Sequence, residues 1–363
     1  MVRMIVQHQE YRGRMAPDTH DVPASDTLDR AALTSYLRWH LEGQHIPGLQ
    51  LDAAMHVVSC AGGRSRLTDV VRLGGAEFVL RRPRLGGVAP DTNAVAREYR
   101  WLSVVHPHFE LAPRPLLLCE DTAVIGSPFF LMERRRGMAV RASEPVTLAH
   151  PDLRRQLSEA VVDTLATLHE LDVEMVPEGL RSPAGFAGAQ VHEWTERWRR
   201  AHDQPVVDMD AVALWLSAHA PVDSLEPNVV HGHFALENLL LNPLHPAEVT
   251  AVLDWETAVL GDPLWDLGVL LAHWVPVRTD DGDAVVGTVT SGEGYLTRDA
   301  LVHRYADRTG RDLDELTFFE VFALFQSAVV RQEWVAAESQ PPDERGHRPE
   351  VHALARRART LIA

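Results

Sequence analysis

Two stretches of this sequence decide the fold, Val230-His231-Gly232-His233-Phe234-Ala235-Leu236-Glu237-Asn238 and Val252-Leu253-Asp254-Trp255-Glu256. Each joins a short apolar, strand-like run to polar groups. Phosphoryl transfer needs a divalent cation held by oxygen ligands, because the charge of the transferring phosphate must be neutralised. The amide of Asn238 and the carboxylate of Asp254, each expected at the end of a short strand, would supply such ligands. Taken singly, either residue more often caps a turn.

The chain around these stretches is expected to fold in two parts. Residues 1–28 lack apolar periodicity and should form a flexible tail. Strands are predicted at 67–73 and 77–80, separated by Gly74-Gly75, with a further β-prone run at 123–132. Helices are predicted at 27–41, 93–105 and 153–171, and from 264 to the end apart from a loop at 279–293. Residues 229–241 and 249–254 are predicted as strands around a polar loop. The sequence therefore predicts an α+β fold, with a small antiparallel β lobe (29–133) before a larger helical lobe (134–363).

Composition limits the class of protein. A chain of 363 residues with 45% hydrophobic and 24% charged residues is typical of a soluble globular protein. No apolar run is long enough for a membrane helix, and the basic, polar start does not resemble a secretory signal, so a cytoplasmic location is expected. The net charge of −16 argues against a nucleic-acid partner.

Residue usage adds two constraints. Cys60 and Cys119 are the two cysteines of the sequence, which excludes a disulfide scaffold and a Cys-x-x-Cys metal site. The sequence contains no lysine, so all 35 basic residues are arginine. Any role that lysine usually performs must therefore be filled by arginine.

The two stretches, followed by Gly261-Asp262-Pro263-Leu264-Trp265-Asp266-Leu267, resemble the catalytic and metal-binding loops of the aminoglycoside phosphotransferase and choline kinase family. The similarity is greatest to the branch whose kinase-like domain is fused to certain acyl-CoA dehydrogenases. The family pattern is His-Gly-Asp, four residues, Asn, then Ile/Leu-Asp-Trp-Glu, leading to Gly-Asp-Pro and Asp-Leu. The resemblance covers roughly residues 29–335. It implies a two-lobed protein-kinase-like fold, ATP or GTP as phosphoryl donor, Mg²⁺, and a small hydroxylated substrate. We expect the chain to be a monomer or a homodimer.

Carried over by position, the resemblance implies a role for each matching residue. Asn238 and Asp254 would hold Mg²⁺, and Asp266 would brace the catalytic loop. Arg81 takes the place of the lysine that binds the donor phosphates, and Glu98 would pair with it, whereas Arg82 points to the other face of its strand and should be solvated or structural. The remaining nucleotide-binding positions are the phosphate turn Gly62, Gly63, Arg64 and Ser65, and the hinge Met132 and Glu133.

The sequence departs from the family at His233, where the pattern has the catalytic aspartate. His233 itself could accept the proton of the attacking hydroxyl, since imidazole titrates near neutral pH. Alternatively, phosphotransfer is lost and the fold binds a ligand or partner, or the site uses imidazole for other acid/base chemistry. We expect phosphotransfer, on the strength of the other matching positions.

Two further hypotheses concern neighbouring residues. In a strand, His231 and His233 would share one face and, with His245, could begin a zinc site, although the resemblance gives His231 a bracing role instead. The acceptor is expected to bind between the catalytic loop and the helical C-terminal region, a natural-product, antibiotic or hydroxyacyl compound being the expected type. Its candidate contacts, each of which could equally be a packing residue, are Trp194, Trp198, His273, Trp274, Gln332, Glu333 and Trp334. The acidic run Asp280-Asp281-Gly282-Asp283 is expected to be a solvated loop.

Overall fold

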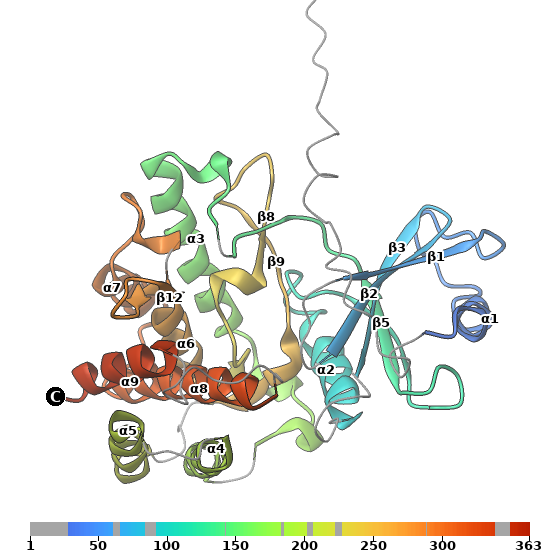
Figure 1. Cartoon of the computed structure of the whole chain (residues 1–363). Helices are drawn as coiled ribbons and strands as arrows, with labels where there is room; N and C mark the ends of the chain where they lie inside the picture. The colour runs from blue at the N-terminus through green and yellow to red at the C-terminus, as the bar shows by residue number, and fades with distance from the viewer. Residues whose placement is uncertain are drawn as a thin grey trace, which may run out of the picture. The chain divides into compact units, whose positions relative to one another are not determined.

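The computed structural model describes residues 28–60, 66–83, 92–141, 143–182, 185–201, 206–221, 227–287, 289–337 and 349–363. These residues form two compact units (Figure 1). The first holds the described residues up to Arg100 together with Arg114–Arg134, and the second holds Trp101–Pro113 and Arg135–Ala363. The predicted tail up to residue 27 and the predicted phosphate turn Gly62–Ser65 lie outside the described residues.

The first unit is built on a five-stranded antiparallel sheet. Its strands, in spatial order, are β1 (Met55–Cys60), β2 (Arg66–Leu73), β3 (Ala76–Pro83), β5 (Phe129–Glu133) and β4 (Pro115–Cys119). Gly74, at a φ of 66°, forms the tight turn of the predicted β2–β3 hairpin. The predicted strand at 123–132 is too long: a turn closed by the Gly126 N–H and the Thr122 carbonyl precedes it, so pairing begins at Phe129.

Helix α1 (Arg30–His40) covers one face of this sheet. The Asp29 carboxylate caps its N-terminus by accepting from the backbone N–H groups of Ala31 and Ala32. Leu33, Leu37 and Leu41 are fully buried, and they pack in one cluster with apolar residues of the sheet that include Phe78, Leu80, Phe129 and Leu131. Alternation along β3 then places Arg81 on the opposite face from Phe78 and Leu80. Helix α2 (Thr92–Val105) supplies the partner of Arg81.

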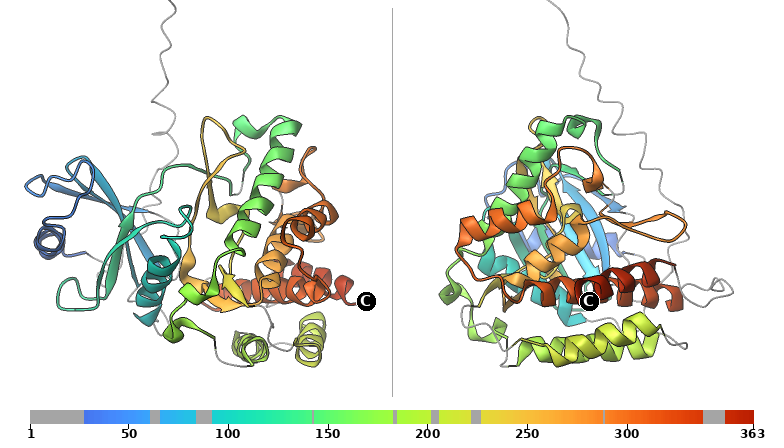
Figure 2. Two further views of the ribbon diagram at one scale, coloured as in Figure 1. Left: turned by 180° about the vertical axis from the view of Figure 1, so that it is seen from behind. Right: turned by 90° about the vertical axis from the view of Figure 1, so that its left-hand side faces the viewer.

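The second unit is mainly helical, as predicted, and contains α3 (Pro151–Leu168), α4 (Phe186–Ala201), α5 (Val207–Ala218), α6 (Leu264–Trp274), α7 (Arg298–Thr309), α8 (Leu316–Ala337) and α9 (Pro349–Leu361). Helix α8 packs against α4, α5, α6 and α9, and α3 packs against α7 (Figure 2). Gly268 allows α6 to approach α8 closely, because a Cβ there would lie 2.5 Å from the backbone of Phe319. Short 3₁₀ turns occupy Val146–Leu148, Val173–Met175, Glu178–Leu180, Leu236–Asn238, Trp255–Thr257 and Val289–Ser291.

Short strands position the loops of the second unit. β6 (Met138–Ala139), β8 (Leu239–Leu241) and β9 (Val249–Val252) form one sheet, β7 (Asn228–Val230) pairs with β10 (Val259–Gly261), and β11 (Val277–Arg278) pairs with β12 (Ala284–Val286). The segment 229–241, predicted as strand, is strand only near its two ends, in β7 and β8. Gly232, at a φ of 81°, cannot continue the strand, so the chain leaves β7 at His231 and re-enters a strand only at Leu239.

Two segments differ further from expectation. Residues 101–113, expected in the first lobe, belong to the second unit, where the Val252 N–H donates to the Leu111 carbonyl at 2.9 Å. The predicted loop 279–293 contains β12, and its acidic run forms the exposed tip of the β11–β12 hairpin, with Asp280 paired to Arg356 at 2.8 Å.

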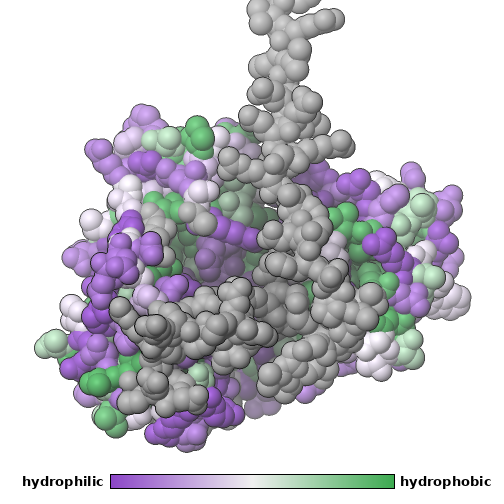
Figure 3. All heavy atoms as spheres, viewed as in Figure 1, coloured by the Kyte–Doolittle hydropathy of each residue, from purple (hydrophilic) through white to green (hydrophobic). Residues whose placement is uncertain are grey.

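The surface is mixed in character. On the face shown in Figure 3, hydrophilic residues predominate on each unit and hydrophobic ones are interspersed among them. Within the described ranges, no helix combines the length and hydropathy needed to cross a bilayer.

Candidate active site

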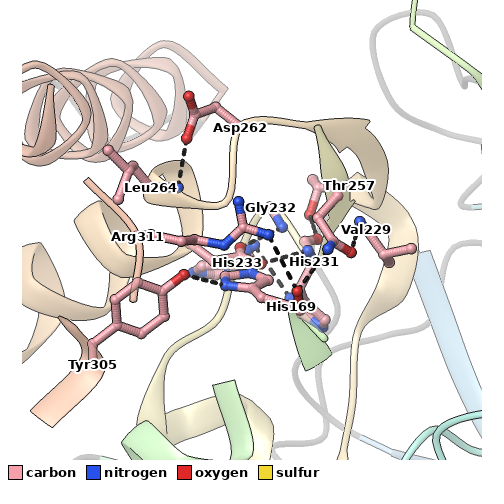
Figure 4. Close-up of polar contacts among 12 residues, drawn as sticks. His169, Val229, His231, Gly232, His233, Thr257, Asp262, Leu264, Tyr305 and Arg311 are labelled. Carbon is pink, nitrogen blue, oxygen red and sulfur yellow. Dashed lines mark hydrogen bonds and ion pairs between the residues drawn. The ribbon is translucent and has the colours of Figure 1, made fainter. Parts of the chain in front are cut away.

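Asp266 on α6 anchors the loop that follows β7. Its carboxylate is fully buried and accepts the backbone N–H of His231 at 2.6 Å and that of Gly232 at 2.7 Å. The His169 imidazole lies 3.3 Å from the same carboxylate and 2.7 Å from the Tyr305 hydroxyl (Figure 4). The bracing role expected for Asp266 is thus confirmed. His169 and Tyr305 were not singled out from the sequence, because His169 is the residue that ends α3, Tyr305 lies on α7, and neither carries a motif.

His231 joins this loop to the end of β9. Its Nδ1 accepts the backbone N–H of His233 at 3.2 Å, so Nε2 carries the proton and donates to the Leu253 carbonyl at 2.9 Å. Burial lowers the pKa of His231, although the charges of Asp266 and Asp254 act in the opposite direction. Both ring nitrogens are used within the fold, so the hypothesis of a zinc site on His231, His233 and His245 is wrong.

Gly232 is required by the packing around it. A Cβ at this position would lie 2.5 Å from the Thr257 carbonyl oxygen, closer than any side chain tolerates. The Thr257 hydroxyl also donates to the His231 carbonyl at 3.0 Å. The loop before His233 is therefore fixed on both sides.

The backbone brings the Asn238 and Asp254 segments together. Leu239 pairs with Val252, and the Leu253 N–H donates to the Asn238 carbonyl at 2.8 Å. The Asn238 side-chain amide donates to the His233 carbonyl at 3.0 Å, which leaves the side-chain oxygen as an acceptor. Contrary to expectation, Asn238 precedes its strand and Asp254 lies two residues beyond β9, but the two segments still adjoin.

Asp254 has an unusual backbone conformation. With a φ of 70°, it is the one non-glycine residue of the described chain in the left-handed region. Such strain costs of order 1–3 kcal/mol and is concentrated at functional sites. Such a conformation makes Asp254 a candidate for a functional position, and its role as a metal ligand remains a prediction. Together, the Asn238 amide oxygen and the Asp254 carboxylate are hard oxygen donors of the kind that Mg²⁺ prefers.

His233 projects from this fixed loop with 37% of its side chain exposed. Its Nε2 lies 3.7 Å from a carboxylate oxygen of Glu237, and its ring centroid lies 5.4 Å from that of His273 on α6. Burial lowers the pKa of His273 to about 3, and the charges of His233 and Arg331 act in the same direction.

Among the other acceptor candidates, five have packing or pairing roles. Trp198 is buried, and the Trp274 indole donates to the Leu296 carbonyl at 2.9 Å. Gln332 is buried and donates to the Ala201 carbonyl, and Glu333 forms an ion pair with Arg197, which also stacks on Trp194. The side chain of Trp334 lies outside the described residues. Within the described chain, His273 is thus the acceptor candidate whose contact with His233 is established.

The first unit holds the expected arginine–glutamate pair. Arg81 Nη2 lies 3.3 Å from the Glu98 carboxylate, which is 1% exposed, and Arg81 also donates to the Thr68 hydroxyl. Arg82, on the other face of β3, forms a buried ion pair with Asp69, consistent with a structural role.

The expected hinge residues lie at the end of β5. Met132 is buried and pairs with Val79 of β3, and the Glu133 N–H donates to the Arg114 carbonyl at 2.9 Å. Their role in contacting a nucleotide base remains a prediction.

The sheet unit, the helical unit and the loops around Asn238 and Asp254 are those of the kinase-like fold of phosphotransferases. The chain belongs to the Phosphotransferase enzyme family, whose model matches residues 56–319. It is 32% identical over 318 residues to acyl-CoA dehydrogenase family member 11 of Pongo abelii, covering 87% of this chain and 40% of that protein. The chain therefore spans less than half the length of this relative.

Solved structures show the same fold. A protein of Ralstonia eutropha assigned to the aminoglycoside phosphotransferases has 24% identity and a TM-score of 0.71, covering 92% of this chain and 99% of that one. The aminoglycoside phosphotransferase APH(2″)-IIIa, solved with GDP and kanamycin, has 15% identity and a TM-score of 0.59, covering 91% and 98% of the two chains.

Proposed function

We propose that this chain transfers the terminal phosphoryl group of ATP or GTP to a hydroxyl group of a small metabolite, with Mg²⁺. The observation that carries the proposal is the left-handed backbone of Asp254 beside Asn238. The N–H of Leu253, the residue before Asp254, donates to the Asn238 carbonyl. Asp266 fixes the start of the loop that contains Asn238. A site that had lost phosphotransfer would have no need to retain this strain. The GDP bound to APH(2″)-IIIa supports a nucleotide as the donor.

Each position that matches the family pattern has a physical role in the proposal. Asn238 and Asp254 would hold Mg²⁺, which neutralises charge on the donor phosphates when it is bound. Arg81, oriented by Glu98, would bind donor phosphates with its planar guanidinium. The predicted phosphate turn and the hinge residues Met132 and Glu133 complete the nucleotide site in this proposal.

His233 would accept the proton of the attacking hydroxyl. Its backbone is fixed by the bonds of its N–H to His231 and of its carbonyl to Asn238, while the imidazole remains accessible. The transition state of phosphoryl transfer is usually loose, so orientation of the hydroxyl matters more than the strength of the base. A histidine at the aspartate position is therefore compatible with transfer.

We propose a natural-product, antibiotic or hydroxyacyl compound as the acceptor, used by a cytoplasmic monomer or homodimer. The presence of kanamycin in one neighbour and the resemblance to an acyl-CoA dehydrogenase family protein support a small hydroxylated molecule without choosing among these types. The competing function is acid/base chemistry, or ligand binding alone, in a retained kinase fold, and the neighbouring rings of His233 and His273 favour that reading.

Variants at His233 separate the two functions. Phosphate release from γ-labelled ATP and GTP is measured with Mg²⁺, alone and with a panel of aminoglycoside, macrolide and hydroxyacyl acceptors. The His233→Ala variant loses the general base, so its turnover should fall by about 10²-fold or more. The His233→Asp variant should retain turnover. The matched control is His303→Ala, which removes an exposed histidine of α7.

Two results would reject the proposal. If the wild-type chain releases no phosphate and yields no phosphorylated acceptor with either nucleotide, phosphotransfer is absent. If His233→Ala turns over as fast as the wild type, His233 is not the proton acceptor.

A further inference from the structure

Three ligand-type side chains meet beside the catalytic loop. One nitrogen of His233, one nitrogen of His273 and one carboxylate oxygen of Glu237 all lie within 4.8 Å of one another. Within this group, His233 Nε2 lies 3.7 Å from a carboxylate oxygen of Glu237. Over the described ranges, this is the one group of three or more histidine, cysteine or carboxylate residues close enough to share an ion.

The fold holds these residues on two connected elements. His233 and Glu237 lie on the loop between β7 and β8, and His273 lies in the last turn of α6. Asp266, which anchors that loop by two backbone hydrogen bonds, precedes His273 by two helical turns on the same helix. The same helix therefore fixes the loop and presents the third ligand to it.

We propose that His233, Glu237 and His273 form a binding site for a divalent transition-metal ion such as Zn²⁺, distinct from the Mg²⁺ site proposed at Asn238 and Asp254. Two imidazoles and one carboxylate are a ligand set of three-ligand zinc sites, in which a fourth position stays open to water. Imidazole nitrogen favours zinc, copper, iron and nickel over magnesium. This site should therefore prefer a transition-metal ion to Mg²⁺, whereas the oxygen ligands of Asn238 and Asp254 should prefer Mg²⁺.

The geometry requires only a small adjustment. Bonds of about 2.0–2.1 Å in a tetrahedral site separate two ligand atoms by about 3.4 Å. The 3.7 Å between His233 and Glu237 is close to this value, and the 4.8 Å limit of the group leaves about 1.4 Å to close. His233 and Glu237 are both partly exposed, so side-chain rotation alone can bring them closer.

One positive charge opposes metal binding. Arg331 is near enough to His273 to lower its pKa, so it also repels a cation held by that ring. The Glu237 carboxylate offsets this repulsion. We therefore expect a site of moderate affinity, which Arg331→Gln should tighten.

Metal binding and phosphotransfer would exclude one another. An ion bound to His233 Nε2 occupies the lone pair with which that ring would accept a proton. This consequence rests on the proposed function, whereas the binding of the metal does not. Zinc should therefore inhibit phosphate release by the wild type, and removal of the ion by a chelator should restore it.

The test titrates metal-free full-length protein, without a histidine tag, with Co²⁺ and Zn²⁺. We expect one ion per chain, a visible Co²⁺ absorption of low coordination number, and displacement of Co²⁺ by Zn²⁺ but not by Mg²⁺. Glu237→Gln and His273→Ala should each weaken binding at least tenfold. The matched controls, His245→Ala and Glu248→Gln in the β8–β9 turn, should leave the affinity unchanged.

The outcomes separate this proposal from the proposed function. Asp254→Ala should lose Mg²⁺-dependent nucleotide binding and keep the Co²⁺ spectrum. Absence of stoichiometric Co²⁺ or Zn²⁺ binding by the wild type would overturn the proposal. Wild-type affinity for the metal in the Glu237→Gln variant would also overturn the proposal. Glu237 is exposed, and the melting temperature of this variant shows whether it is folded.

Discussion

Asp254 and Asp266 are both carboxylates of the candidate site, but their structural settings differ. Asp254 lies two residues beyond β9 with a left-handed backbone, whereas Asp266 lies on α6, is fully buried and accepts hydrogen bonds from the backbone of the loop after β7. The family resemblance predicts the roles of both residues, as it predicts the Arg81–Glu98 pair. It could not predict that His273 meets His233, because 40 residues separate them and only the packing of α6 beside the loop joins them.

At the scale of the residue, Asp266→Ala should lower the free energy of unfolding by about 3–5 kcal/mol. The substitution leaves the buried N–H groups of His231 and Gly232, and the His169 ring, without their shared acceptor. Urea unfolding at neutral pH measures the change. Asp281→Ala, at the exposed hairpin tip, serves as control and should remain within about 0.5 kcal/mol of the wild type. An equally small effect of Asp266→Ala would refute the bracing role.

At the scale of the element, apolar periodicity predicts α1, α2, α3 and the β2–β3 hairpin, because each has a regular core-facing side. It does not predict where β7 ends. The run from Val229 to Leu241 is apolar enough for one strand, and it is Gly232, held against Thr257, that interrupts it. His233 lies directly after this interruption. The strand prediction therefore fails in the segment that contains the proposed proton acceptor.

The ion pair between Glu144 and Arg154 predicts that the stability of the protein depends on pH. Arg154 of α3 donates to both carboxylate oxygens of Glu144, at 2.8 and 2.6 Å, and the Tyr295 hydroxyl donates at 2.7 Å. Burial acts to raise the pKa of Glu144, but these hydrogen bonds outweigh it and the pKa is lowered from its ordinary value of 4.5. Because the pKa of Glu144 is lower in the folded chain than in the unfolded chain, the unfolded chain binds the proton more readily. The stabilisation by charged Glu144 is therefore complete above pH 4.5 and is lost as the pH falls.

Glu144→Gln should therefore be less stable than the wild type by about 1–3 kcal/mol at pH 7. The difference should shrink progressively as the pH falls below about 4.5. Urea unfolding at a series of pH values measures it, with Glu315→Gln, an exposed carboxylate, as the control. A difference that does not vary with pH would contradict the assignment of this stabilisation to the charged carboxylate.

At the scale of the whole molecule, the order of the motifs is enough to predict a small sheet unit followed by a helical unit. It does not show that residues 101–113 belong to the helical unit, because that assignment depends on contacts between residues far apart in sequence. Examples are the hydrogen bond between Leu111 and Val252 and the ring contact between Phe109 and Trp255. The match of the family model over residues 56–319 spans both units, so the class of protein rests on the whole architecture.

The central claim, that Asn238 and Asp254 serve a Mg²⁺-dependent nucleotide site, is tested most directly by the melting temperature of the full chain with ATP or GTP. A ligand that binds only the folded state at 100 times its Kd stabilises it by about 2.7 kcal/mol. We predict a higher melting temperature with one or both nucleotides when Mg²⁺ is present, and none of this increase in Asp254→Ala, while Asp281→Ala behaves as the wild type. An unchanged melting temperature of the wild type with both nucleotides and Mg²⁺ would contradict the account.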